Sequence, residues 1–390
     1  MKQQILSMML EDIHHQGEKV AAELPVIEKQ IAELGTSNAL TDARRVFFVG
    51  CGDSYYAGMA ARLAFQAWTG VWAEAIESLE FRYLANRLPE GSLVIGISVS
   101  GQVERTLDCL VRAKEQGALT LGITGTPQSR IYSVAEHVID MGIRVREPGP
   151  VPQTVYFLAN IVTLYQLALS LGLTKGTLAA EEAQTIRQSL SDALGKVRQV
   201  AEHNHGKVME YVETLNAPQP LVLVGGGPNW ATAHFGVAKL LEAALVLGVV
   251  QELEEWAHEQ YFLTGPELHT VLIGAEGIVQ DRLGPTAQAV RSLKGSLALV
   301  VPEKTDLGVE TTTVWEYPTG VPEPLSPILT KIPLELLAYS LAQYLDRRPF
   351  DYDNPTRKSV VERTIYRDGE SAEMVNRRRG RPNHGDRSDT

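Results

Sequence analysis

Residues 46–54 run Val46-Phe47-Phe48-Val49-Gly50-Cys51-Gly52-Asp53-Ser54. An apolar run that ends in glycines and a hydroxyl predicts a buried strand, a tight turn and the start of a helix. The same pattern returns at 221–229 as Leu221-Val222-Leu223-Val224-Gly225-Gly226-Gly227-Pro228-Asn229. A repeat of this size predicts two similar α/β lobes with a ligand bound where they meet. Ser54 of the first copy is replaced by Asn229 in the second, so we expect the lobes to divide the chemistry.

The composition is that of a globular protein with room for two hydrophobic cores, since 44% of the 390 residues are hydrophobic. A net charge of −11 argues against binding to nucleic acid, which requires a basic surface. The two cysteines, Cys51 and Cys109, form no CxxC pair, which predicts a reducing compartment with neither a disulfide nor a zinc site. The histidines show no metal-ligand spacing, and we expect no metal or redox cofactor.

Neither a signal peptide nor a membrane span is expected. The N-terminal residues Met1-Lys2-Gln3-Gln4 lack the apolar core of a signal peptide. The most apolar predicted helix, at 231–250, carries His234, Lys239 and Glu242, which a bilayer disfavours. A cytoplasmic location is therefore the simplest prediction.

Strands and helices are predicted to alternate along the chain, which is typical of parallel sheets covered by helices on both faces. A helix or helix pair at 5–34 comes first. The first lobe then has predicted strands at 46–50, 92–98, 118–124 and 137–141, and helices at 57–68, 106–116 and 155–171. After a long helix at 182–215, the second lobe has predicted strands at 221–224, 270–273, 296–301 and 312–317, and helices at 231–247, 277–293 and 325–345.

This pattern divides the chain into an N-terminal helical segment (1–35), a first domain (36–175), a linking helix with a second domain (176–350) and a tail (351–390). We expect the tail to contact the active site before becoming disordered. Residues 376–390 are rich in Arg, Asn, Gly and Asp without apolar anchors, which predicts a disordered, solvated end. The arginines at 377–381 could instead contact an anionic partner.

The stretch Ser98-Val99-Ser100-Gly101-Gln102 closes a predicted strand and opens a helix. Two hydroxyls beside free helix N–H groups suit a phosphate or a carboxylate. An ordinary helix N-cap explains the same residues equally well. Ser54 favours the ligand, because its turn would lie at the same carboxyl edge of the sheet.

A second group of candidate residues consists of Lys239-Leu240-Leu241-Glu242 and Glu254-Glu255-Trp256-Ala257-His258. A carboxylate and an imidazole brought together can move protons to and from carbon and oxygen. Taken alone, however, a glutamate such as Glu242 on an apolar helix is more often a paired structural residue, and a histidine such as His258 is more often a core residue with satisfied hydrogen bonds. Their spacing alone leaves both alternatives open.

From about residue 40 to 360 the chain resembles the double sugar-isomerase (SIS) domain family. That family includes the isomerase half of glutamine–fructose-6-phosphate aminotransferase and standalone fructosamine deglycases and amino-sugar phosphate deaminases. The matching motifs are Gly50–Tyr55 with C-G-T-S-Y, Ser78–Tyr83 with S-E-F-R-Y, Ser98–Gln102 with S-Q-S-G-E-T, and Lys239–Glu242 with K-L-K-E. His258 follows Glu242 at the family spacing. The resemblance implies an α/β fold of two SIS lobes, each with a parallel sheet flanked by helices on both faces.

The resemblance also implies roles for individual residues. Glu242 would move a proton between C1 and C2 of an open-chain sugar, and His258, expected from the neighbouring subunit, would help to open the ring. Lys358 would be the tail lysine that forms a Schiff base. Contacts to the phosphate and the sugar would come from Cys51, Ser54, Ser98, Val99, Ser100, Gln102, Val151, Gln153 and Lys239.

Several residues depart from the family pattern. Val99 and Val103 replace Gln and Thr, which removes two polar contacts that contribute about 0.5–1.5 kcal/mol each. Gln153 replaces a sugar-contacting serine in the V-A-S-T stretch. Trp256 and the loss of a Gly-Pro pair are expected to reshape the pocket wall. The chain begins with a predicted helix rather than a cysteine nucleophile, so we expect no release of ammonia from glutamine.

These observations together predict a homodimer with shared active sites that acts on a sugar phosphate or fructosamine. We expect it to cleave the C–N bond of an amino-sugar or fructosamine phosphate by a 1,2-proton transfer, without a cofactor. The alternatives are an aldose–ketose isomerase, an ammonia-dependent aminotransferase, and a regulator that only binds sugar phosphates. A regulator would not require Glu242 and His258.

Overall fold

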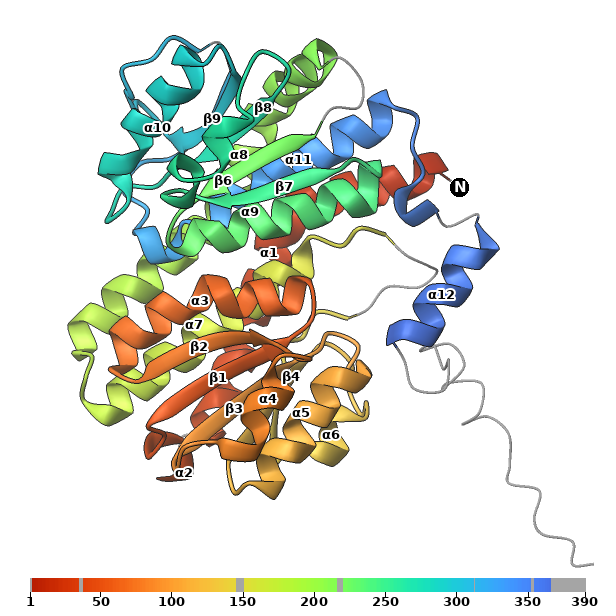
Figure 1. Cartoon of the computed structure of the whole chain (residues 1–390). Coiled ribbons are helices and arrows are strands. Elements are labelled where there is room, and N and C mark those ends of the chain that lie inside the picture. The colour runs from red at the N-terminus through yellow and green to blue at the C-terminus, as the bar shows by residue number, and fades with distance from the viewer. Residues whose placement is uncertain are drawn as a thin grey trace, which may run out of the picture.

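The structure is a computed structural model that describes residues 2–34, 38–144, 151–215, 220–311, 313–351 and 354–365. Figure 1 shows two lobes, each built on a parallel sheet, with helices between the sheets. The expectations for the tail at 376–390 lie outside the described residues.

The two sheets have the same topology. The first is five-stranded and parallel, with the order β2-β1-β3-β4-β5, and the second has the order β10-β9-β8-β6-β7, which is the same order traced from the other edge. The strands of the first sheet are β1 (Arg45–Gly50), β2 (Trp72–Glu77), β3 (Ser92–Ile97), β4 (Leu119–Thr124) and β5 (His137–Asp140). Those of the second are β6 (Leu221–Gly225), β7 (Gly248–Glu252), β8 (His269–Ile273), β9 (Ser296–Pro302) and β10 (Thr313–Tyr317).

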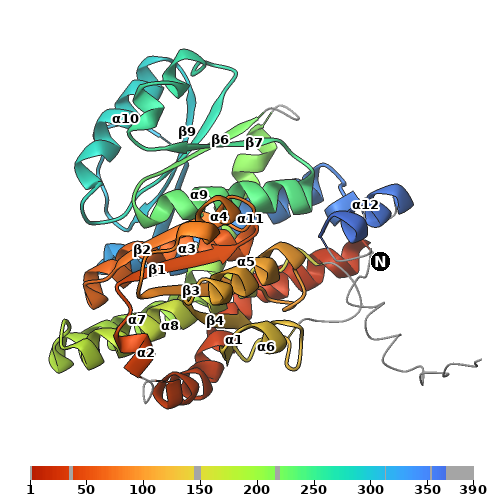
Figure 2. The same ribbon diagram turned by 60° about the horizontal axis from the view of Figure 1, so that its bottom comes forward.

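Helices cover both faces of each sheet (Figures 1 and 2). The layer between the sheets contains α1 (Lys2–Leu34), α3 (Asp53–Thr69), α7 (Val155–Lys175), α8 (Ala180–Thr214), α9 (Pro228–Lys239) and α11 (Pro327–Tyr344). The outer faces are covered by α4 (Phe81–Leu84), α5 (Glu104–Glu115) and α6 (Ile131–Val134) on the first sheet and by α10 (Gln280–Ser292) on the second. The short α2 (Asn38–Thr41) precedes β1, and α12 (Pro355–Ile365) lies at the side of the molecule (Figure 1).

Alternation along the strands produces these layers. In β1, Val46 and Phe48 belong to the central core, whereas Phe47 and Val49 belong to the outer core of the first lobe. Because successive side chains of a strand point to opposite faces, a run of apolar residues requires a sheet buried on both sides. The α/β fold expected from the sequence, with two lobes that each have a parallel sheet between layers of helices, is confirmed.

The turn after the first strand of each lobe has the same backbone conformation in both copies. Gly52 has φ 56 and ψ −130, and Gly227 has φ 55 and ψ −131. This region of backbone space is open to glycine and strained for other residues. The turn brings the following helix close to the strand, since a Cβ on Gly225 would lie 2.3 Å from the carbonyl oxygen of Asn229.

Two strands and one break in a helix were not predicted from the sequence. β2 and β7 are edge strands with partly exposed side chains, so they lack the apolar run that marks the inner strands. The helix predicted at 231–247 is α9 followed by a π-helical turn at Leu240–Ala244.

The most apolar helix is α7, and the assignment of that property to 231–250 was wrong. Among the described residues α7 is the one helix long and apolar enough to cross a membrane, and 83% of its most apolar stretch is buried inside the protein. Its position in the central layer accounts for its composition.

We expect Gly52→Ala to destabilise the protein by about 1–3 kcal/mol, because alanine must adopt a strained backbone conformation. A Cβ at Gly52 has no neighbour within 4 Å, so the cost arises from the backbone alone. Gly195→Ala is the control, since Gly195 is exposed within α8 with open space around it, and it should stabilise by about 0.5–1 kcal/mol. Denaturant unfolding measures the change in the free energy of unfolding for both variants. Equal changes would contradict the conclusion that the backbone at Gly52 is strained for alanine.

Candidate functional site

The loops that follow β1 and β3 lie side by side at the carboxyl edge of the first sheet. The strand order reverses here, since the chain leaves β1 toward β2 on one side while β3 pairs on the other. Open α/β sheets bind ligands at such a point. The first loop contains the predicted residue Cys51 and leads into the first turn of α3 with Ser54, and the second contains Ser98 to Gln102.

The loop after β3 presents polar groups without partners. Ser98 is 1% exposed and Gln102 is 8% exposed, yet Ser98 Oγ and Gln102 Oε1 have no hydrogen-bond partner among the described residues. The carbonyl of Val99 accepts hydrogen bonds from Gly125 N and from the hydroxyls of Thr124 and Thr126, which fixes the loop. Buried polar atoms without partners in a fixed loop are typical of a site that completes its hydrogen bonds with a ligand.

The second lobe shows what its own copy of this loop binds. Val49 pairs with Gly96 and Val224 pairs with Leu272, so Ile278 is the counterpart of Gln102. The backbone N–H of Ile278 donates a 2.9 Å hydrogen bond to the carboxylate of Glu323. The N–H of Gln102 donates instead to Ser100 Oγ at 3.3 Å. One copy of the loop therefore holds a carboxylate of this chain.

Asn229, the counterpart of Ser54, is committed to internal packing. Its amide donates to Ser326 Oγ at 2.9 Å, and its carbonyl oxygen accepts from the hydroxyls of Thr232 and Thr330. The side chain is 1% exposed. Asn229 thus ties α9 to α11.

The end of α9 reaches across to the ligand edge of the first lobe. Helices α3 and α9 pack together between the sheets and run in opposite directions (Figure 1). Tyr56 of α3 stacks on His234 of α9, with ring centroids 5.1 Å apart. Lys239, in the last turn of α9, therefore meets Asp53, in the first turn of α3. Both charges are favourable at those helix ends, where the dipoles have the opposite sign.

Asp53, Lys239 and Glu242 form a charged trio that joins the lobes. Lys239 Nζ lies 2.7 Å from Asp53 Oδ2 and also pairs with Glu242 Oε2. The lysine is 1% exposed, whereas Glu242 retains 29% exposure. Glu242 stands in the π-helical turn, a feature that occurs frequently at functional sites. The turn ends at Leu245, whose φ of 55 is strained for a residue other than glycine.

The electrostatics of the trio suit proton transfer at neutral pH. Burial raises the pKa of Glu242 to about 7; Lys239 opposes this shift and Asp53 adds to it. Burial alone would lower the pKa of Lys239, but the carboxylates of Asp53 and Glu242 outweigh it and raise that pKa. A carboxyl group with a pKa near 7 can both accept and donate a proton at physiological pH.

The predicted residues before α7 are partly buried beside this helix. Val151 is 6% exposed, and Thr154 is fully buried. Gln153 Oε1 and Thr154 Oγ1 are buried without a hydrogen-bond partner among the described residues. Helix α7 packs along α3, whose first residue is Asp53.

His258 is placed differently from Glu242. It follows a 3₁₀ turn at Glu255–Ala257, is 65% exposed, and lies 3.6 Å from Glu254. Lys358 falls in α12, and its side chain lies outside the described residues. The roles of both residues remain predictions.

Trp256, which was expected to reshape the pocket wall, is buried, and its effect on the pocket stays a prediction. Its side chain is 2% exposed and belongs to the outer core of the second lobe, together with Leu253 and Leu283. A large aromatic side chain is stabilised there because it is removed from water.

Asp53 and Tyr56 were not predicted from the sequence as parts of the site. Asp53 stands where the C-G-T-S-Y pattern has threonine, and this change to a charged residue was a signal that could have found it. Burial raises the pKa of Tyr56, and the carboxylates of Asp53, Glu77 and Glu242 add to this shift, which places its hydroxyl near the trio.

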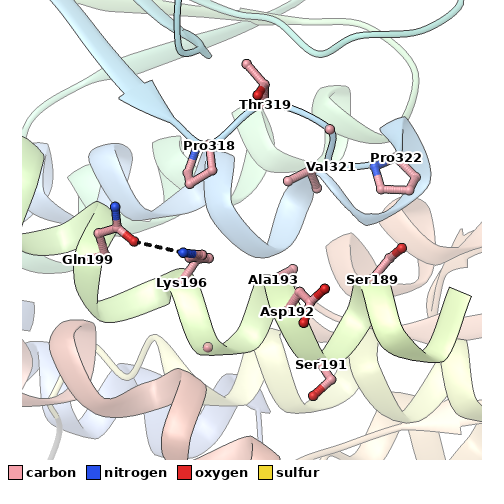
Figure 3. A pocket seen from close by; sticks show the side chains of 12 residues that line it. Ser189, Ser191, Asp192, Ala193, Lys196, Gln199, Pro318, Thr319, Val321 and Pro322 are labelled. Carbon is pink, nitrogen blue, oxygen red and sulfur yellow. Dashed lines mark hydrogen bonds between the residues drawn. The ribbon is translucent and has the colours of Figure 1, made fainter. Parts of the chain in front are cut away.

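A separate cavity of about 480 Å³ lies between α8 and the loop at 318–322 (Figure 3). Exposed side chains such as Asp192 and Lys196 line it, and Lys196 donates a hydrogen bond to Gln199. None of the predicted site residues lies along it. Among the described residues, no group of three or more His, Cys, Asp or Glu side chains is placed to hold a metal ion.

Comparison with known proteins identifies an SIS domain. The SIS domain model matches residues 39–170. Glutamine–fructose-6-phosphate aminotransferase [isomerizing] of Gloeobacter violaceus is 30% identical over 362 residues, which are 90% of this chain and 58% of that protein. Residues 39–170 are therefore an SIS domain, and most of the chain is similar to the aminotransferase. It spans 58% of the length of that relative.

Solved structures share the fold of most of the chain. The C-terminal domain of glucosamine-fructose-6-phosphate aminotransferase from Francisella tularensis aligns with a TM-score of 0.76 at 22% identity, covering 86% of this chain and 95% of that one. Glucosamine-6-phosphate deaminase from Thermotoga maritima aligns with a TM-score of 0.63 at 17% identity, covering 87% and 96%. Both structures are similar to this chain in fold across its two lobes.

We expect Glu242 to titrate near pH 7, protonated below and ionised above, as its pKa indicates. Lys239→Met should raise this pKa further, because the ammonium that favours the carboxylate is lost. Lys207→Met is the control, since Lys207 pairs with Glu316 at 3.1 Å on the surface, and it should leave the titration unchanged. Carbon-13 NMR of labelled glutamate measures the titration. An ordinary glutamate pKa at position 242 would contradict the role given to burial.

Proposed function

We propose that the protein is an isomerase-type enzyme that cleaves the C–N bond of an amino-sugar or fructosamine phosphate. The observation that carries the proposal is the position of Glu242. A carboxyl with a pKa of about 7 stands on the second lobe, ion-paired through Lys239 to the ligand edge of the first. In this arrangement Glu242, which can accept and donate a proton, and the loop after β3, which is proposed to bind an anion, lie on opposite sides of the contact between the two lobes.

The loop after β3 is proposed to bind the phosphate. Ser98 and Ser100 supply hydroxyls, and Ser98 Oγ has no partner among the described residues. The bound carboxylate of Glu323 in the second lobe supports this role, because the corresponding backbone there already accommodates an anion. Cys51, Ser54, Val99, Gln102, Val151 and Gln153 are proposed to line the same site around the sugar.

The reaction follows from one proton transfer. In a fructosamine phosphate, Glu242 would remove a proton from C1 and return one to C2, converting the keto-amine into an imine at C1. Water then adds to the imine, and the C–N bond breaks to release the amine and an aldose phosphate. In an amino-sugar phosphate the proton moves from C2 to C1, and hydrolysis releases ammonia and a ketose phosphate. The step requires a base and an acid of similar pKa, which one carboxyl group supplies.

The name of the relative from Gloeobacter violaceus supports nitrogen chemistry at a sugar phosphate. That protein is an isomerizing aminotransferase of fructose 6-phosphate. Cleavage and formation of the C–N bond share the same proton transfer, so the same base serves either direction. Simple aldose–ketose isomerisation is the second candidate, because it requires Glu242 and the phosphate loop but no nitrogen.

We further propose a homodimer in which His258 completes the site of the partner subunit. His258 is 65% exposed on a segment that also exposes Leu247, Phe262 and Leu263 to 63%, 72% and 76%. Exposed apolar side chains of this size are typical of a surface that binds another protein. Lys358 is proposed as the Schiff-base lysine, carried by α12.

Glu242→Gln should reduce turnover by about 10²- to 10⁴-fold while leaving sugar-phosphate binding nearly intact, because it keeps the shape and removes the base. The assay follows released amine, ammonia and new sugar phosphates by mass spectrometry. The substrates are fructosamine 6-phosphates, glucosamine 6-phosphate and their unphosphorylated analogues. Glu210→Gln, an exposed position on α8, is the matched control and should retain full activity.

The outcome separates the candidate functions. Release of amine or ammonia that is lost in Glu242→Gln supports C–N cleavage. Interconversion of aldose and ketose phosphates without loss of nitrogen would identify an isomerase instead. Thermal stabilisation by sugar phosphates without any turnover would support a regulator.

Glu242→Gln and His258→Ala should complement each other if the two residues act across the dimer. Each variant alone is expected to be inactive, and a co-expressed mixture should recover about one quarter of wild-type activity, because half of the dimers contain one intact site. Turnover of the mixture measures this recovery. A mixture that stays inactive, or a protein that sediments as a monomer, would contradict the shared site.

A further inference from the structure

Asp53 has one oxygen that the fold leaves unused. Its Oδ2 forms the 2.7 Å ion pair with Lys239. Its Oδ1 is buried without a hydrogen-bond partner among the described residues. A buried carboxylate oxygen without a donor is costly, so a donor from a ligand would be favourable there.

The charges around Asp53 do not balance. Asp53 and Glu242 share the single ammonium group of Lys239, so the trio carries one net negative charge when Glu242 is ionised and none when it is protonated. The Lys239 ammonium is also held 5.2 Å from the ring centroid of Phe235, on the protein side of the trio. Lys331 also interacts with Asp53 and Lys239, but it is paired with Glu335, so this second pair adds no net charge. Tyr56 carries no charge either, since burial raises its pKa and keeps its hydroxyl protonated. A positively charged ligand group would neutralise the excess.

The position of Asp53 relative to the phosphate loop decides which ligand group this is. Asp53 opens α3 after β1, and Ser98 follows the neighbouring strand β3. A second anion of the ligand would be repelled by Asp53, and a neutral hydroxyl would gain less from it than a cation. A sugar phosphate held at Ser98 therefore gains most if its other end carries a protonated nitrogen.

We infer that Asp53 selects substrates whose nitrogen at C1 or C2 is positively charged, by accepting a hydrogen bond from that nitrogen at Oδ1. This inference rests on the proposed function and narrows its substrate class to amines that are protonated at neutral pH. Asp53 is a specificity-determining residue, and the proton transfer itself belongs to Glu242. A purely structural ion pair with Lys239 explains the position of Asp53 Oδ2, but it does not explain why Asp53 Oδ1 is buried without a hydrogen-bond partner among the described residues.

The test uses two unreactive open-chain ligands that differ at one atom. These are 2-amino-2-deoxyglucitol 6-phosphate, which carries an ammonium at C2, and sorbitol 6-phosphate, which carries a hydroxyl there. Isothermal titration calorimetry on the full chain at pH 7 should show at least about ten-fold tighter binding of the amine, as expected for a charge-assisted hydrogen bond. Asp53→Asn should abolish this preference and leave the affinity for sorbitol 6-phosphate within about two-fold.

Two further variants make the result specific. Glu210→Gln removes the same charge from an exposed residue of α8, and it should preserve the preference. Asp53→Thr introduces the threonine of the C-G-T-S-Y pattern, and it should also abolish the preference for the amine. This second variant keeps the test usable if Asp53→Asn fails to fold.

Each other outcome overturns a definite part of the account. Equal affinity of the wild type for both ligands, or an equal loss of both in the Asp53 variants, would overturn the inference and leave Asp53 as an interlobe ion pair. The proposed function, which is sugar-phosphate binding with release of an amine, would be unaffected by that result. Failure of the wild type to bind either ligand would refute the phosphate loop, and with it the proposed function.

Discussion

The ion pair between Lys239 and Asp53 is the interaction on which the site depends. It connects the last turn of α9 to the first turn of α3, and so fixes the second lobe over the ligand edge of the first. The same ammonium holds Glu242, whose carboxyl would otherwise turn toward solvent at its 29% exposed position. Because a buried pair is costly to break, this contact also fixes the relative position of the lobes.

The two lobes have kept one backbone design and diverged in their side chains. The glycine turns at Gly52 and Gly227 agree within one degree in both dihedral angles. In the second lobe, however, Asn229 is bound to α11 and the loop at Ile278 is occupied by Glu323. The second lobe thus fills its own ligand edge and contributes Lys239 and Glu242 to the other. Duplication followed by this division explains why the repeat carries only one complete set of candidate residues.

Much of the fold could be predicted from the sequence, because inner strands such as β1 are apolar on both faces. The edge strands β2 and β7 could not, since their exposed faces interrupt the apolar pattern. The motif around Glu242 was recognisable, but the π-helical turn that presents it leaves no trace in residue spacing. Asp53 could not be predicted as part of the site, because its partner Lys239 is distant in sequence and becomes a neighbour only when α9 packs on α3.

The central claim is that one ligand bridges the loop of the first lobe and the carboxyl of the second. A crystal structure of Glu242→Gln with sorbitol 6-phosphate tests it most directly. The account predicts the phosphate on the hydroxyls of Ser98 and Ser100, with C1 and C2 in contact with the side chain at position 242. A phosphate bound elsewhere, or a sugar out of reach of position 242, would contradict it.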